Sequence, residues 1–230
     1  MKTLTYPFRV ALALVLLFTS LSAYSQRSRE YIRTQIQKQG NCRNVAITKT
    51  NGDLMLYGRN GWAATGCPTG LTRALDELND DGEYIDDVQL TESGSWLILY
   101  GDNGMQWNNV PYSLERKMRE YNNRGDVITS VTFNDAGWWI IISEEYISAS
   151  SSKLQSWLAD GTERYGQLWA ACVTDDAVVA VYESGYKFEG NVPEGLKTAL
   201  RNTTLDVYRL KIAGSSWFFA DKKGAYQYHM

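Results

Sequence analysis

The amino-acid sequence predicts a mainly β fold with helices, in which five β-β-β-α units follow one another along the chain. The segment LMLYGRNG at Leu54–Gly61 returns as LILYGDNG at Leu97–Gly104. Units begin near residues 45, 88, 131, 171 and 210, so the period stays at about 40 residues, which is typical of a repeat architecture. Each unit also carries the same succession of strand, turn and helix signals.

The three strands of a unit, here named A, B and C, are clearest in the second copy. Alternating apolar and polar residues at Val88–Thr91 indicate a half-buried strand A. A turn containing glycine leads to a continuous apolar strand B at Trp96–Tyr100. The Asn-Gly pair that follows predicts a two-residue type I′ hairpin, because both central residues of that turn need positive φ. Strand C is then expected at Met105–Val110.

The segment GDNG could also be part of a cation-binding loop, because Asp102 is a suitable oxygen ligand. The repeat decides between the two interpretations. Arg59 occupies the equivalent position in the first unit, and Lys222 occupies it in the last. A cation loop would not accept a positive side chain there, so the segment is expected to be a turn.

The last element of each unit is predicted to be a helix. Pro111 opens it in the second unit, since proline suits the first helical turn. Leu114, Met118 and Tyr121 then fall on one face of the helix. Gly125 supplies the left-handed residue that ends it.

The ends of the chain indicate how the units are arranged. A lone helix is expected at Ser28–Gln39, before the first strand, and the last unit has no helix of its own. A linear solenoid would instead need polar caps at both ends. We therefore expect residues 26–230 to form a single domain, a β-propeller-like ring of five units in which the N-terminal helix completes the last unit. Closure would also remove exposed sheet edges.

The repeated unit, with its GSWLILYGDNG segment followed by a proline and spaced leucines, resembles those of secreted bacterial repeat proteins with GGWVVLYGDNGYW-type units. The SAYSQ segment is similar to signal-peptide cleavage regions of the Bacteroidetes. The likeness covers the chain after that segment and is clearest in the first two units. It implies a β-propeller-like fold and an envelope location, and it brings no catalytic residues.

The first 25 residues are predicted to be a cleaved signal peptide. Lys2 and Arg9 precede the apolar run Val10–Leu21, which is too short for a comfortable membrane span. Small residues before Gln26 fit a cleavage site, and the residue directly after that site is Gln26 and not the cysteine of a bacterial lipoprotein. A secreted or periplasmic protein without a membrane span is therefore expected.

Composition excludes several classes of function. The chain has 23 basic and 26 acidic residues, so it lacks the positive charge of a nucleic-acid-binding protein. His229 is the only histidine, which excludes a Ser-His-Asp triad and a histidine-ligated zinc site. We expect no metal and no cofactor. The cysteines at 42, 67 and 172 form no disulfide framework, and Cys42 and Cys67 are expected at opposite ends of their strands, too far apart to pair.

Two functions from different classes stay open. The preferred one is a non-catalytic binding module that presents a rigid rim to a protein or glycan. The alternative is a glycan-cleaving enzyme, which needs only two carboxylates. Four acidic pairs could supply them, although all are expected in turns, where aspartate is common: Asp80-Asp81, Asp86-Asp87, Glu144-Glu145 and Asp175-Asp176.

Tryptophan side chains could form a platform for a glycan, because their flat apolar faces can stack on sugar rings. Trp96, Trp139 and Trp217 recur at one place in strand B, so packing between units explains them. Four others have no consistent counterpart in the repeat, namely Trp107, Trp138, Trp157 and Trp169. Core packing is the favoured interpretation of these four as well.

The strand directions divide the loops between two rims. The A–B turns and the loops before the helices share one rim, here the A–B rim, and the B–C turns share the other, the B–C rim. The binding surface is expected at the A–B rim, where short polar groups and carboxylates recur near the innermost strand and suit hydroxyl-rich or cationic partners. The candidate residues are Thr48, Thr91, Glu92, Asn134, Asp135, Thr174 and Asp175.

Overall fold

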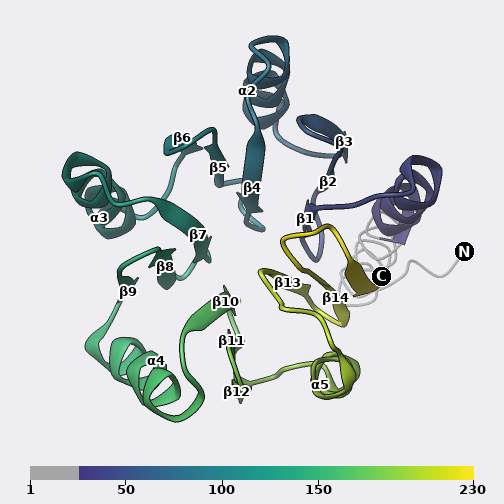
Figure 1. The fold of residues 1–230 in the computed structure, drawn as a ribbon. Helices are drawn as coiled ribbons and strands as arrows, with labels where there is room; N and C mark the ends of the chain where they lie inside the picture. The colour runs from purple at the N-terminus through teal and green to yellow at the C-terminus, as the bar shows by residue number, and fades with distance from the viewer. Residues whose placement is uncertain (1–25) are drawn as a thin grey trace, which may run out of the picture.

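A computed structural model describes residues 26–230, and the predicted signal peptide lies outside the described residues. Within residues 26–230 the chain forms five three-stranded antiparallel sheets, each preceded by a helix. Figure 1 shows the sheets arranged around a common centre, with helices at the outside. No helix of this part of the chain is long and apolar enough to cross a membrane.

The repeat predicted from the sequence is present in the element order. The N-terminal helix, residues 26–39, comes first. The first two units contain β1 (Asn44–Ala46), β2 (Asp53–Tyr57), β3 (Gly61–Thr65) and α2 (Thr69–Asp80), then β4 (Ile85–Leu90), β5 (Trp96–Tyr100), β6 (Gly104–Asn108) and α3 (Tyr112–Arg124).

The other three units follow the same order. The third contains β7 (Ile128–Phe133), β8 (Trp139–Ser143), β9 (Ile147–Ala149) and α4 (Ser152–Tyr165). The fourth contains β10 (Leu168–Val173), β11 (Ala177–Tyr182), β12 (Gly185–Gly190) and α5 (Glu194–Asn202). The fifth contains β13 (Arg209–Ala213), β14 (Ser216–Ala220) and β15 (Tyr226–His229).

Strand A lies innermost in each sheet, as predicted (Figure 1). Each of these strands contacts the next one along the chain: β1 contacts β4, β4 contacts β7, β7 contacts β10 and β10 contacts β13. In addition, β1 contacts both β13 and β14 of the last unit. The first and last sheets therefore lie side by side.

The helices bury their apolar faces between successive sheets. In α2, Leu71 and Leu75 pack against Leu56 of their own unit and Val88 of the next. The expected face of α3 is buried, and Gly125 ends that helix at a φ of 80°. The sequence signals for helix position and ending are thereby confirmed.

The N-terminal helix packs in the same manner between the last and first sheets. Ile32 and Ile36 are buried in one cluster with Phe218 of β14 and Met55 of β2. The expected contact between this helix and the strands of the fifth unit is confirmed.

A tryptophan that recurs in the second, third and fifth sheets joins each of these sheets to the start of the preceding helix. The indole Nε1 of Trp139 donates a hydrogen bond to Ser113 Oγ at 2.9 Å, in the first turn of α3. Trp96 lies in the same manner against Gly70 of α2. The predicted packing of these residues between units is confirmed, since Trp96, Trp139 and Trp217 are all buried.

The first sheet replaces this tryptophan with an acid. Asp53 occupies the equivalent position at the start of β2, and it forms a buried ion pair with Arg29 of the N-terminal helix. Arg29 Nε also donates to Ser216 Oγ in the last sheet at 3.1 Å. Burial raises the pKa of Asp53 although Arg29 acts in the opposite direction. One arginine thus connects the first sheet, the last sheet and the helix between them.

The predicted two-residue hairpin is wrong in detail. Tyr100 pairs with Gly104, so the loop between β5 and β6 has three residues. The positive φ of 58° falls on Gly101 rather than on Asn103 or Gly104. A side chain at Gly104 would also collide with the ring of Tyr100, at 2.4 Å from its nearest atom. The glycine is therefore required for a close approach, and the segment is still a turn.

The acidic pair Asp86-Asp87 does not lie in a turn, so that prediction from the sequence is wrong. Both residues lie in strand β4. Asp87 is fully buried, and the hydrogen bonds that it accepts compensate for the loss of its hydration. Asp80 is the last residue of α2, and Asp81 is its C-cap.

A polar network fills the centre, where the innermost strands meet. Lys211 Nζ of β13 donates to Asp87 Oδ1 at 2.6 Å and to the carbonyl of Val88 at 3.2 Å. Asn44 Nδ2 donates to the same carboxylate oxygen at 2.6 Å. Burial alone would raise the pKa of Asp87, but Lys211 and Arg209 together hold it below its ordinary value. The network connects strands of the first, second and fifth units.

The three cysteines are free thiols, as expected for Cys42 and Cys67. Burial raises the pKa of the Cys42 and Cys67 thiols to about 12. Both thiols are therefore protonated and unreactive at neutral pH.

We predict that Lys211→Met lowers the free energy of unfolding by about 3–5 kcal/mol, because it leaves the buried Asp87 carboxylate without its cation. The double variant Lys211→Met, Asp87→Asn should recover much of this loss. Urea unfolding measures both. The matched control is Lys197→Met, which breaks an exposed ion pair with Glu194 and should cost less than about 1 kcal/mol. Equal costs in Lys211→Met and the control would contradict the prediction.

Acid should weaken the same network. Because the folded state lowers the pKa of Asp87, the pair stabilises fully above the ordinary aspartate pKa, and the stabilisation is lost as the pH falls below about 4. The double variant has neither titrating group. We therefore expect the stability difference between the parent and the double variant to be constant from pH 7 to 5 and to fall between pH 4 and 3. A difference that stays constant down to pH 3 would refute this.

Candidate functional site

The residues predicted for binding lie together at the A–B rim, but most of them already have structural partners. Thr48 and Thr91 are buried. Thr48 Oγ1 donates to the carbonyl of Gly52 at 3.0 Å and closes its own turn. Asn134 Nδ2 donates to the carbonyl of Thr174 in the next unit at 2.9 Å. These short polar side chains hold the turns and the neighbouring units together.

Two of the three predicted carboxylates bind the turn of a neighbouring unit. Glu92 accepts hydrogen bonds from the backbone N–H of Lys49 and, at 3.1 Å, from that of Thr50. Asp135 accepts from the N–H of Ser93 at 2.8 Å and from its hydroxyl at 2.6 Å. Backbone donors thus satisfy these carboxylates, whose recurrence follows from the contact between units.

Asp175 is the remaining predicted carboxylate, and it is exposed. The hollow at the centre of the A–B rim is small, about 50 Å³, and its lining includes Glu92, Asp135 and Asp175. Such a volume is far below the several hundred Å³ of an ordinary ligand site.

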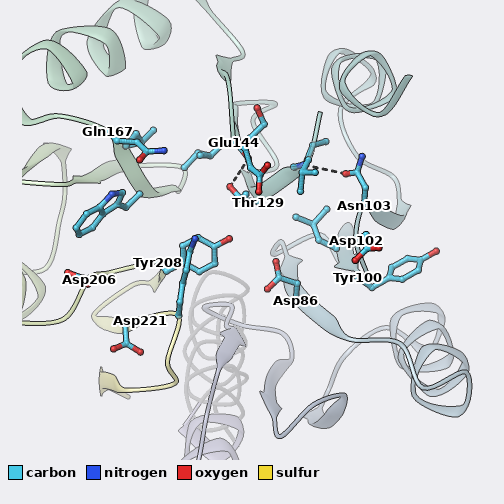
Figure 2. Close-up of a pocket in the computed structure, with 18 of the residues that line it drawn as sticks. Asp86, Tyr100, Asp102, Asn103, Thr129, Glu144, Gln167, Asp206, Tyr208 and Asp221 are labelled. Atoms are coloured by element: carbon cyan, nitrogen blue, oxygen red, sulfur yellow. Dashed lines mark hydrogen bonds between the residues drawn. The ribbon is translucent and has the colours of Figure 1, made fainter. Parts of the chain in front are cut away.

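A much larger cavity of about 520 Å³ opens at the B–C rim. Figure 2 shows side chains from four units around it, including Asp86, Thr129, Gln167 and Tyr208. This volume is within the range of small-molecule and oligosaccharide sites. The structure therefore places the main cavity at the rim opposite to the predicted one.

The repeat explains which side chains reach this cavity. Just before or at the start of each strand A, a buried apolar residue holds one position in all units: Cys42, Ile85, Ile128, Leu168 and Val207. The residues on either side of it point to the opposite face, because side chains alternate along an extended chain. These two flanking sites are called the variable positions here.

The variable positions carry a different chemistry in every unit. The one before the buried residue holds Asn41, Tyr84, Val127, Gln167 and Asp206. The one after it holds Arg43, Asp86, Thr129, Trp169 and Tyr208. All except Asn41 line the large cavity or a smaller one beside it.

A β-bulge creates the second variable position in three units. The pairing of strands A and B shifts at Asp86, Thr129 and Trp169, so each of these residues lacks a partner in strand B. A bulge frees one side chain from the ladder and redirects it. The site is therefore built by a backbone feature that is common to the units and by side chains that differ.

Several polar groups in the cavity make no hydrogen bond through their side chains to any residue in 26–230. They are the exposed side chains of Asp102, Glu144, Gln167 and Asp206. Others are occupied: Asn103 Nδ2 donates to Asn122 Oδ1 at 2.9 Å, and Thr129 Oγ1 donates to the carbonyl of Ile142 at 3.1 Å. The half-buried indole of Trp169 adds a flat apolar surface beside the free groups.

No group of three or more His, Cys, Asp or Glu side chains within the described part of the chain is placed to hold a metal ion. A comparison with protein-family models gave no match to the chain, and a comparison with curated protein sequences gave none either.

The roles of the A–B rim carboxylates can be separated by substitution. We predict that Glu92→Ala and Asp135→Ala each lower the free energy of unfolding by about 1–2 kcal/mol, because each leaves backbone donors of the preceding unit without an acceptor. Asp175→Ala is the matched control and should change stability by less than about 0.5 kcal/mol. Urea unfolding curves measure all three. An unchanged stability of Glu92→Ala would contradict this role.

Proposed function

We propose that the protein is a non-catalytic glycan-binding module of the cell envelope, and that the cavity at the B–C rim is its binding site. The observation that carries the proposal is the indole of Trp169 beside free polar groups in a cavity of about 520 Å³. Aromatic faces pack against the apolar faces of sugar rings, while carboxylates and amides accept and donate hydrogen bonds to hydroxyl groups.

The proposal includes the arrangement of the units and their location. We propose that residues 26–230 form one domain, a closed β-propeller-like ring related to the secreted bacterial repeat proteins that the sequence resembles. Contacts of β1 with β13 and β14, and the shared cluster around Ile32, support closure. The N-terminal sequence supports export to the periplasm or the medium after removal of residues 1–25.

Binding is favoured over cleavage by the state of the carboxylates. A glycosidase needs one carboxylic acid kept protonated by a desolvated surrounding and a second carboxylate opposite it. Asp102, Glu144 and Asp206 are exposed, and Asp86 is paired with Arg209 at 2.6 Å. These surroundings suit hydrogen bonding to hydroxyl groups better than proton transfer.

The site is tested with a glycan array followed by isothermal titration calorimetry. We predict that Trp169→Ala weakens binding of the best array glycan about tenfold or more, and that Trp169→Phe retains part of the affinity through its ring. Trp138→Ala is the matched control, because Trp138 is 51% exposed at the opposite rim. It should bind as the parent does.

Three outcomes would contradict this assignment. Loss of binding in Trp138→Ala but not in Trp169→Ala would move the site to the A–B rim. Absence of glycan binding by the folded parent, together with capture of a protein partner, would replace the glycan by a protein. Release of reducing ends that stops in Glu144→Gln or Asp206→Asn would show an enzyme instead of a binding module.

A further inference from the structure

A second cavity of about 260 Å³ adjoins the large one at the B–C rim. The two share four lining residues, which are Asp86, Tyr208, Asp221 and Lys222. A chain-like molecule in the large cavity can therefore extend into the smaller one.

Arg43 is fixed in the smaller cavity without a counter-ion. Its Nη2 donates to the carbonyls of Arg59 at 2.9 Å and Ile85 at 2.8 Å, and its Nε donates to the carbonyl of Gly58. The guanidinium lies over the ring of Tyr84, 4.4 Å from its centroid. No carboxylate of residues 26–230 forms an ion pair with it, and Nη1 makes no hydrogen bond to them. Backbone carbonyls therefore orient the guanidinium of Arg43, but because they are neutral they do not cancel its positive charge.

Lys222 is a second cation of this kind. Its Nζ lies 4.3 Å from the ring centroid of Tyr208. No aspartate or glutamate in the described part of the chain lies within ion-pair distance of it. A cation over an aromatic ring keeps its charge available to a further anion.

The carboxylates of the smaller cavity are already engaged. Asp86 pairs with Arg209 at 2.6 Å. Asp221 Oδ1 accepts from the backbone N–H groups of Lys223 at 2.8 Å and Ala225 at 2.9 Å. Apart from the Asp86–Arg209 pair, the smaller cavity is lined by two cations, Arg43 and Lys222, and by one carboxylate, Asp221, so one positive charge is left over there. The large cavity instead carries the free carboxylates Asp102, Glu144 and Asp206.

We propose that the smaller cavity binds the anionic substituent, a carboxylate or a sulfate, of an acidic sugar unit, while the neighbouring neutral sugars occupy the large cavity. This inference rests on the proposed glycan-binding function. Arginine matches the planar, bidentate geometry of a carboxylate and also binds sulfate oxygens. The free carboxylates of the large cavity repel a second anion, so a sparsely charged glycan fits and a dense polyanion does not.

The test uses three matched trisaccharides in isothermal titration calorimetry with the purified protein. One ends in a glucuronate, one is its carboxyl-reduced form, and one carries a terminal sulfate. We expect at least one acidic form to bind about tenfold more tightly than the reduced form, with a preference that weakens as salt is raised. The acidic form that binds identifies the anion as carboxylate or sulfate.

Two variants locate the charge effect. Lys222→Gln and Arg43→Gln should each reduce the preference for the acidic form several-fold and leave the affinity for the reduced form unchanged. Lys223→Gln is the matched control, because Lys223 lines only the large cavity. Circular dichroism and thermal unfolding check folding, and Lys222→Gln decides the outcome if Arg43→Gln does not fold.

The failure of this inference differs from the failure of the proposed function. Equal binding of acidic and reduced forms, or a preference unchanged in both variants, overturns the inference and leaves the glycan-binding site in place. Absence of binding by all three trisaccharides and by every glycan of the array overturns both.

Discussion

The constraint on which the structure depends is that no single unit of this repeat can cover its own apolar residues. Strands A and B are buried along nearly their whole length, which is more apolar surface than one three-stranded sheet and one helix can enclose. Each sheet therefore needs a neighbour on either side and a helix to cover the gap between them. The N-terminal helix supplies this cover between the first and last sheets, with Ile32 and Ile36 in the shared cluster.

Because every unit has to pack in this way, the units share one backbone arrangement, while a few side chains at the start of strand A can differ between them. Residues such as Ile85 and Ile128 must be apolar, because they sit between packed sheets. Their neighbours Asp86 and Thr129 point away from the packing into the cavity. Toward the centre the buried residues vary too, but every polar group there has to find a partner, as Asp87 does in Lys211.

The sequence predicted the units, the strand order and the helix ends, because these depend on local signals such as Gly125 and the repeated leucines. The prediction of a two-residue hairpin was wrong because Gly104 does not adopt a positive φ. A glycine is needed there because any side chain would collide with the ring of Tyr100. The A–B rim was predicted from the recurrence of Glu92 and Asp135, and in the structure both side chains bond to a neighbouring unit. The cavities at the B–C rim are lined instead by residues that differ between units, as from Arg43 to Asp86 to Trp169 within one position of the repeat.

The contacts of Arg29 with Asp53 and Ser216 determine when, relative to synthesis, the protein can complete its folding. The N-terminal helix is synthesised first, but β14 is among the last strands to appear. The apolar face of the N-terminal helix has no complete packing partner until almost the whole chain has been synthesised. Contacts so far apart in sequence are slow to form, because they close a long loop of chain. Folding can therefore finish only after synthesis is nearly complete.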